Sequence, residues 1–140
     1  MGTIAQVFES GEQSAKKGLF SNLVRLTRVD GIVSETEVAL LNRIARKLSL
    51  TNEQANEIIR HPDNYPMVPP VSLEERFERY IQFIQMTFVD GVVDEQEKKL
   101  IAKYGIALGF RDEDATNHAK IILGQVVKGV ESADILKSIV

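Results

Sequence analysis

The feature that most constrains the fold of this chain is an internal repeat. The segment LTRVDGIVSETEVALLNRIARKLSL, residues 26–50, is similar to MTFVDGVVDEQEKKLIAKYGIALGF, residues 86–110. Nine positions are identical between the two segments, and most of them cluster around a shared Val-Asp-Gly turn. Solenoid architectures need about three or more copies to bury a continuous core. Two copies therefore favour a domain with two-fold pseudo-symmetry.

Both repeats have the apolar spacing of α-helices. The first repeat places residues of one helix face at i, i+3, i+4 and i+7, namely Phe20, Leu23, Val24 and Thr27. The second repeat has the same spacing, at Phe77, Tyr80, Ile81 and Ile84. No alternating run is bracketed by hairpin turns, so strands are not expected. We predict an all-α fold, a compact bundle of about seven helices built from two pseudo-symmetric repeats.

The expected domain organisation follows from the repeats and from the prolines. All four prolines lie in the stretch HPDNYPMVPPVS, residues 61–72, which cannot continue a helix and is interpreted as a connector. Repeat one covers about 13–60 and repeat two about 73–128. A chain of 140 residues is expected to form a single domain, 1–140. The expected helices are 3–9, 13–29, 35–48, 52–60, 73–89, 95–108, 113–128 and 132–139.

Helix-start signals support this plan. Ser34 with Glu37 forms the S-x-x-E pattern of a capping box, and Asp94 with Glu97 is its acidic counterpart. Asp112 is expected to be a further N-cap, because a short polar side chain there can accept a hydrogen bond from the first turn.

Two glycines lie in or near the penultimate helix, Gly124 and Gly129. A glycine inside a helix costs about 1 kcal/mol relative to alanine. We therefore expect each of them either to allow close packing or to mark the helix end.

Composition excludes several classes of function. The chain has no cysteine, which rules out disulfides, thiolate chemistry and cysteine-based zinc sites. A net charge of −3 argues against broad nucleic-acid binding, which depends on excess positive charge. No apolar run approaches the ~20 residues of a membrane helix, and the first residues lack the features of a secretory signal. We expect a cytoplasmic protein without direct membrane insertion.

The most informative motif is the Asp-Gly turn, D-G-I-V-S-E-T-E at 30–37 and D-G-V-V-D-E-Q-E at 90–97. Both copies match the second half of the calcium-loop pattern D-x-[DN]-x-[DN]-G-x₅-E. Oxygen ligands on both sides of such a turn can converge on a hard cation, calcium or magnesium. The candidate metal ligands are Asp30, Glu37, Asp90 and Glu97. The first half of the loop lacks its carboxylates, so neither copy is a complete EF-hand.

The same carboxylates have a structural explanation. A glutamate three residues after the N-cap closes a capping box and interacts favourably with the helix dipole, which accounts for Glu37 and Glu97. Asp30 and Asp90 can close a tight turn by accepting backbone hydrogen bonds. The residues leave both interpretations open.

No motif indicates catalysis. The chain contains no G-x-S-x-G, P-loop or G-x-G-x-x-G sequence. Its two histidines, His61 and His118, have no second histidine or cysteine nearby in sequence with which to bind zinc. We therefore predict a non-enzymatic protein with no catalytic residue, and no cofactor other than a possible divalent cation.

The pattern V-D-G-[IV]-V-[SD]-E-x-E, followed by an amphipathic helix and present twice, resembles the tellurite-resistance TerB-like family. The resemblance covers the chain from about Phe20 to Val127. It implies a fold of about seven helices and a non-enzymatic domain, linked to stress responses, whose acidic residues can bind divalent cations. It points to Asp30, Glu37, Asp90 and Glu97 as those residues. Val29 and Val89 stand where alanine is frequent in the family.

Three functional hypotheses follow. The first is a TerB-like domain that binds divalent cations and acts as a stress-response or interaction module. The alternative is a structural scaffold that binds a partner protein through an apolar groove, with the acidic residues only capping helices. Both of these expect a protein partner. The third, a catalytic alternative, is a small metal-dependent hydrolase, which predicts a pocket beside the acidic turns.

Overall fold

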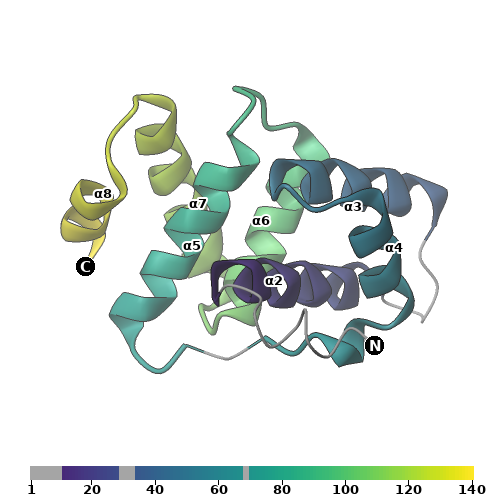
Figure 1. Ribbon diagram of the computed structural model, residues 1–140. Coiled ribbons are helices and arrows are strands. Elements are labelled where there is room, and N and C mark those ends of the chain that lie inside the picture. Colours follow the sequence, from purple (N-terminus) through teal and green to yellow (C-terminus); the bar gives the residue numbers. More distant parts are fainter. Residues whose placement is uncertain (1–10, 29–33, 68–69) are drawn as a thin grey trace. The chain divides into compact units, whose positions relative to one another are not determined.

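The computed structural model describes residues 11–28, 34–67 and 70–140, and within these ranges every regular element is a helix (Figure 1). The expected helix 3–9 lies outside the described residues. The all-α prediction is confirmed, and each described helix begins and ends within two residues of its expected bounds. The elements are α2 (Gly11–Thr27), α3 (Glu35–Lys47), α4 (Asn52–Arg60), the 3-10 turn η1 (Pro62–Asn64), α5 (Leu73–Thr87), α6 (Glu95–Ala107), α7 (Asp112–Val127) and α8 (Ser132–Ile139).

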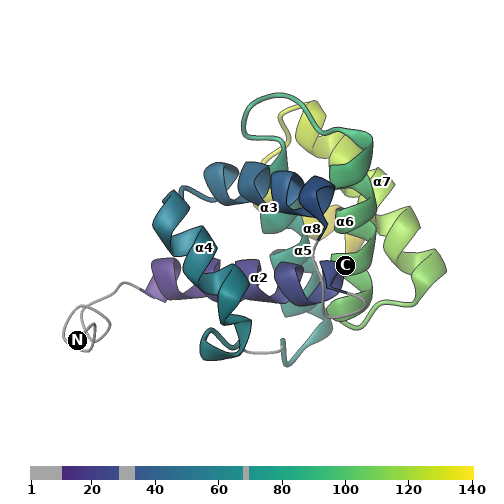
Figure 2. The same cartoon turned by 90° about the vertical axis from the view of Figure 1, so that its right-hand side faces the viewer.

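The chain divides into two compact units, and each unit contains one repeat. Unit 1 is Met1–Val68 and unit 2 is Pro69–Val140, so the boundary lies in the proline-rich connector. In unit 1, α2 packs against α3, α4 and η1; in unit 2, α5 packs against α6, α7 and α8 (Figure 2). The first helix of each repeat contacts every other element of its unit and buries the most side chains of that unit.

The two cores use equivalent positions. Nine buried apolar side chains of unit 1 have a buried apolar counterpart 60 positions later in unit 2. The pairs are Phe20/Tyr80, Leu23/Phe83, Val24/Ile84, Leu40/Leu100, Leu41/Ile101, Ile44/Tyr104, Leu48/Leu108, Leu50/Phe110 and Ala55/Ala115. Because burial of apolar surface is the main favourable term in folding, this shared set explains why both repeats form the same three-helix arrangement.

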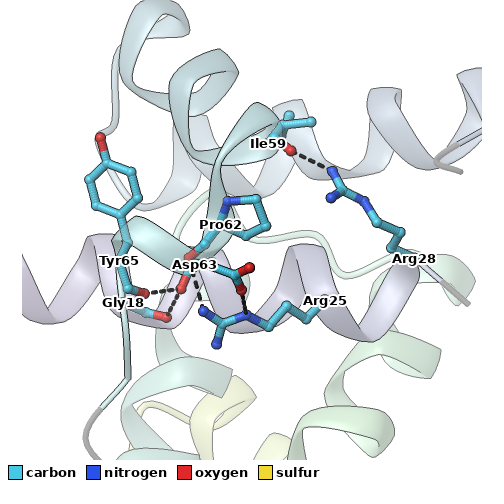
Figure 3. Close-up of polar contacts among 8 residues, drawn as sticks. Gly18, Arg25, Arg28, Ile59, Pro62, Asp63 and Tyr65 are labelled. Atoms are coloured by element: carbon cyan, nitrogen blue, oxygen red, sulfur yellow. Dashed lines mark hydrogen bonds and ion pairs between the residues drawn. The ribbon is translucent and has the colours of Figure 1, made fainter. Parts of the chain in front are cut away.

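Polar side chains of α2 and of the residue that follows it hold the end of α4 and the start of the connector (Figure 3). Ser21, which is fully buried, donates a hydrogen bond to the Tyr65 carbonyl. Arg25 Nη2 donates to the Pro62 carbonyl at 2.9 Å, and Arg28, just after α2, donates to the Ile59 carbonyl. Ile59 lies in the last turn of α4, where carbonyls lack a helical N–H, whereas the Pro62 carbonyl also accepts the Tyr65 N–H. The three side chains thus tie α2 to the last turn of α4 and to η1.

In unit 2 the helix equivalent to α2 is α5, and the side chain of Tyr80 links it to α6 and α7. Tyr80 is fully buried, and its hydroxyl donates to the Ile101 carbonyl at 2.8 Å, with the Ala115 carbonyl at 3.3 Å. Gly105 leaves room for this ring, since a Cβ there would lie 2.7 Å from the tyrosine oxygen. The equivalent pair in repeat one is Phe20 and Ala45. Repeat one thus combines a ring that has no hydroxyl with a residue that has a Cβ, whereas repeat two combines a tyrosine with a glycine.

Both second helices end in the same way. Leu50 N donates to Ala45 O at 2.9 Å, and Phe110 N donates to Gly105 O at 3.1 Å, which is the long hydrogen bond of a Schellman motif. The residue before each donor adopts a positive φ, 63° at Ser49 and 108° at Gly109. Repeat one therefore places a serine where the backbone favours glycine.

One expected cap is wrong. The N-cap of α7 is Arg111, which makes no side-chain capping bond, and Asp112 is the first helical residue. Asp112 is succeeded by two more acidic residues in the first turn, so this helix start is stabilised by charge near the dipole instead of by a side-chain cap. Within the described part of the chain, no helix combines the length and the apolarity needed to cross a membrane.

We predict that Gly105→Ala lowers the free energy of unfolding by about 1–3 kcal/mol, because the new Cβ would lie under 3.0 Å from Tyr80 and Ala115. The loss should shrink in a Tyr80→Phe background, since removal of the hydroxyl clears the nearest contact. Urea unfolding of the two single variants and the double variant measures this coupling. Gly124→Ala is the control, because its Cβ would meet nothing within 4 Å. Equal losses in both backgrounds would contradict the proposed fit.

Ser49→Gly should raise the stability of unit 1 by about 0.5–1 kcal/mol, because relief of the left-handed conformation exceeds the extra entropy of glycine in the unfolded chain. Amide hydrogen exchange in α3 provides a local readout. At the equivalent position of repeat two, Gly109→Ala replaces a glycine by a residue with a Cβ and should therefore destabilise unit 2. A stability that stays the same or falls in Ser49→Gly would show that the serine carries no strain.

Candidate functional site

The second Asp-Gly motif forms the turn between α5 and α6. Gly91 has φ 81°, and its N–H donates to the Phe88 carbonyl at 2.8 Å. Asp90 Oδ1 accepts a hydrogen bond from the backbone N–H of Val92 at 3.1 Å. An aspartate that bonds the backbone two residues later forms an Asx-turn. The turn is thus built by the aspartate and glycine that the sequence singled out.

The acidic residues that follow this turn form a complete capping box. Asp94 Oδ1 accepts from Glu97 N at 2.8 Å, and Glu97 Oε1 accepts from Asp94 N at 3.0 Å. Glu97 is only 2% exposed. A buried carboxylate needs hydrogen-bond partners to offset its lost hydration, and the helix start provides one of them. The expected acidic counterpart of the first capping box is therefore confirmed.

The first motif repeats this arrangement at the start of α3. Ser34 Oγ accepts from Glu37 N at 3.2 Å, and Glu37 Oε1 accepts from Ser34 N at 3.1 Å. Glu37 is half-buried. Asp30 and Gly31 lie outside the described residues, so the upstream half of this candidate site has no description. Thr51 with Gln54 forms a third box of the same kind at α4.

Of the four candidate ligands, the structure thus places Asp90, Glu37 and Glu97. Asp90 and Glu97 flank one turn, and each accepts a backbone N–H from its own motif. Calcium takes six to eight oxygen ligands. Across residues 11–28, 34–67 and 70–140, no three or more carboxylate, histidine or cysteine side chains are grouped so that they could hold a metal ion.

Neither histidine belongs to a polar cluster. His61 is exposed at the C-cap of α4, as expected for a polar group near the last carbonyls. His118 packs edge-on against two rings of unit 2, with centroids 4.9 Å from Phe77 and 5.1 Å from Phe110. It is therefore part of an aromatic cluster of the core.

Two tyrosines have clearly raised pKa values, and both belong to the core of unit 2. Burial raises the pKa of Tyr104 to about 12, with the Arg79 guanidinium opposing the shift. Burial also raises the pKa of the Tyr80 hydroxyl far above its ordinary value. Perturbed groups mark active sites when they line a cleft. Here the cause is burial among core side chains, where a neutral phenol is the stable form.

The sequence did not predict the side chains that hold the connector, Ser21, Arg25 and Arg28, of which Figure 3 labels the two arginines. A faint signal existed, since Ser21 interrupts the apolar face of α2 at the position where repeat two has Ile81. The ion pair of Arg25 with Asp63, at 3.5 Å, adds little because the aspartate is almost fully exposed.

Comparisons with protein-family models, with curated proteins and with solved structures found no match to this chain. The resemblance to the TerB-like family stays a prediction that rests on the two Asp-Gly motifs.

We expect Asp94→Ala to lower the free energy of unfolding by about 0.5–2 kcal/mol, because it removes the side-chain acceptor of the α6 capping box. Asp94→Ser is the matched control, since serine fills the same position in repeat one and should retain most of the stability. Urea unfolding measures both. If Ala and Ser cost the same, the cap bond makes no net contribution.

Proposed function

We propose that this chain is a non-enzymatic helical interaction module, in which the acidic motif of the second repeat stabilises the helix start. The burial and the hydrogen bonding of Glu97 carry the proposal. This carboxylate is 2% exposed and hydrogen-bonded to the N-cap of its own helix, a position that suits a structural role. A cation site would instead favour carboxylates that face a shared, accessible space.

The chemistry of the turn supports the same choice. Asp90 Oδ1 is engaged with Val92 N–H, and Asp94 Oδ1 with Glu97 N–H. Each of these bonds gives its carboxylate a structural role in the turn or at the helix start. The positions that complete a calcium loop upstream, Met86 and Phe88, offer no carboxylate. Cation binding, which the family resemblance implies, remains the competing hypothesis.

Exposed apolar side chains support the interaction role. Unit 2 carries several large hydrophobic residues that are about half or more exposed, namely Val71, Leu73, Val89, Val92, Ile106, Ile121, Val127 and Val140. Single exposed apolar residues are ordinary, whereas a contiguous exposed apolar patch marks a contact surface. Of these residues, Ile121 and Val127 share one face of α7. The catalytic alternative receives no comparable support, because the strongly shifted groups are core tyrosines.

A titration of the whole chain with calcium and then magnesium, followed by amide chemical shifts, tests the proposal. We expect no saturable shift in residues 90–97 up to millimolar metal, because the described residues hold no group of three or more potential ligands at this turn. Asp90→Asn should leave the titration unchanged.

Two results would overturn this function. Saturable shifts in residues 90–97 that disappear in Asp90→Asn would establish a cation site in repeat two. Saturable shifts in residues 30–37 that disappear in Asp30→Asn would do the same for repeat one.

A further inference from the structure

The outward face of the second half of α7 is exposed. Six residues of this face are exposed: Asn117, Lys120, Ile121, Gly124, Val127 and the C-cap Lys128. At 3.6 residues per turn they cover one side of the helix, about 120° wide. Ile121 is 51% exposed and Val127 is 56% exposed. The face thus combines apolar side chains with two lysines.

Gly124 lies between the two exposed apolar residues, three positions from each. A glycine inside a helix costs about 1 kcal/mol relative to alanine. Two other glycines have a local reason: Gly105 accommodates Tyr80, and Gly129 adopts φ 80° after the C-cap. Gly124 has neither reason: it lies within the helix, and an added Cβ would meet nothing within 4 Å. The space beside Gly124 is therefore available to something that approaches from outside.

A second helix that packs against α7 could approach most closely at this glycine. Helix axes pack 8–10 Å apart, and small residues at the contact allow the closest approach. Ile121 and Val127 would then lie on either side of the incoming backbone. An anionic membrane surface would also suit lysines and exposed aliphatic groups, but it would gain nothing from a missing Cβ. The geometry of the face favours a helix.

The charges on this face of α7 indicate which charges a partner helix would carry. From Thr116 to Val127, α7 contains no carboxylate, and Lys120 and Lys128 are both exposed on the docking face. Charge complementarity across an interface directs association and excludes partners of like charge. A partner with carboxylates beside its apolar stripe matches this pattern.

We infer that the face of α7 formed by Lys120, Ile121, Gly124, Val127 and Lys128 docks an acidic amphipathic helix of a partner protein, whose backbone crosses at Gly124. The inference rests on the proposed function and names the surface and the partner class. It does not involve the Asp-Gly motifs.

The test uses the full chain and a synthetic amphipathic peptide of about 18 residues, long enough for helix formation on binding. One face of the peptide carries Leu and Ala, and Glu flanks it on both sides; a second peptide has Lys in place of Glu. We expect saturable amide shifts centred on residues 117–128 with the Glu peptide, and at least tenfold weaker binding of the Lys peptide. Lys120→Glu with Lys128→Glu should reverse this preference.

Gly124→Ala separates docking from a merely structural role. It should raise the thermal unfolding midpoint, because alanine favours the helix, and yet weaken binding of the Glu peptide at least fivefold. Val127→Ser should also weaken binding, whereas Val71→Ser, at a residue 89% exposed before α5, should not.

Several outcomes would overturn the inference. These are no saturable binding of the Glu peptide, equal binding of both peptides, or binding that Gly124→Ala leaves unchanged. Binding to vesicles with anionic headgroups that is insensitive to Gly124→Ala would assign the face to a membrane surface. Concentration-dependent self-association that Val127→Ser abolishes would assign it to a second copy. Peptide shifts confined to other residues would reject the α7 face but leave the interaction module intact, whereas a cation site at the Asp-Gly motifs would reject the proposed function.

Discussion

The burial of one helix in each repeat is the constraint on which the rest of the structure depends. Helix α5 is covered by α6, α7 and α8, and α2 by α3, α4 and η1. Because each of these helices is covered by several neighbours, nearly every turn must present an apolar side chain or a satisfied polar one. Tyr80 meets this demand with a hydroxyl that bonds the Ile101 carbonyl, and Ser21 meets it by bonding the Tyr65 carbonyl. Both are buried polar atoms with protein acceptors, as the cost of desolvation requires.

The helix starts depend on a second constraint, the orphan N–H groups of the first turn. Four such groups are left at every α-helix, and three starts in this chain satisfy two of them with reciprocal capping boxes. This requirement selects Ser, Thr or Asp at the N-cap and Glu or Gln three residues later. The same residue types supply oxygen ligands for cations. The overlap explains why an acidic motif can resemble a cation loop while it serves the backbone.

The sequence predicted the helices well because periodicity and caps are local properties. The bounds of α4 and α8 were predicted without error, and Ser34 and Asp94 begin α3 and α6 with the capping boxes that the sequence predicts. The arginine contacts to Ile59 and Pro62 were not predictable, because their acceptors are carbonyls that carry no residue-specific signal. The candidate site was only half predictable. Residue types identified Glu97 and Asp94, but whether their oxygens face the backbone or an ion depends on side-chain geometry and burial.

The difference in length between α4 and α7 bears on function. At the offset of the repeat, Arg60 corresponds to Lys120, so α4 ends where the docking face of α7 begins. Pro62 excludes continuation in repeat one, and Ser21, Arg25 and Arg28 bond to carbonyls of α4 and the connector there. In repeat two the helix continues for seven more residues, of which Ile122 is buried. The remaining outward positions are not required by the core that the two repeats share. A contact with another helix accounts for Ile121, Gly124 and Val127 together.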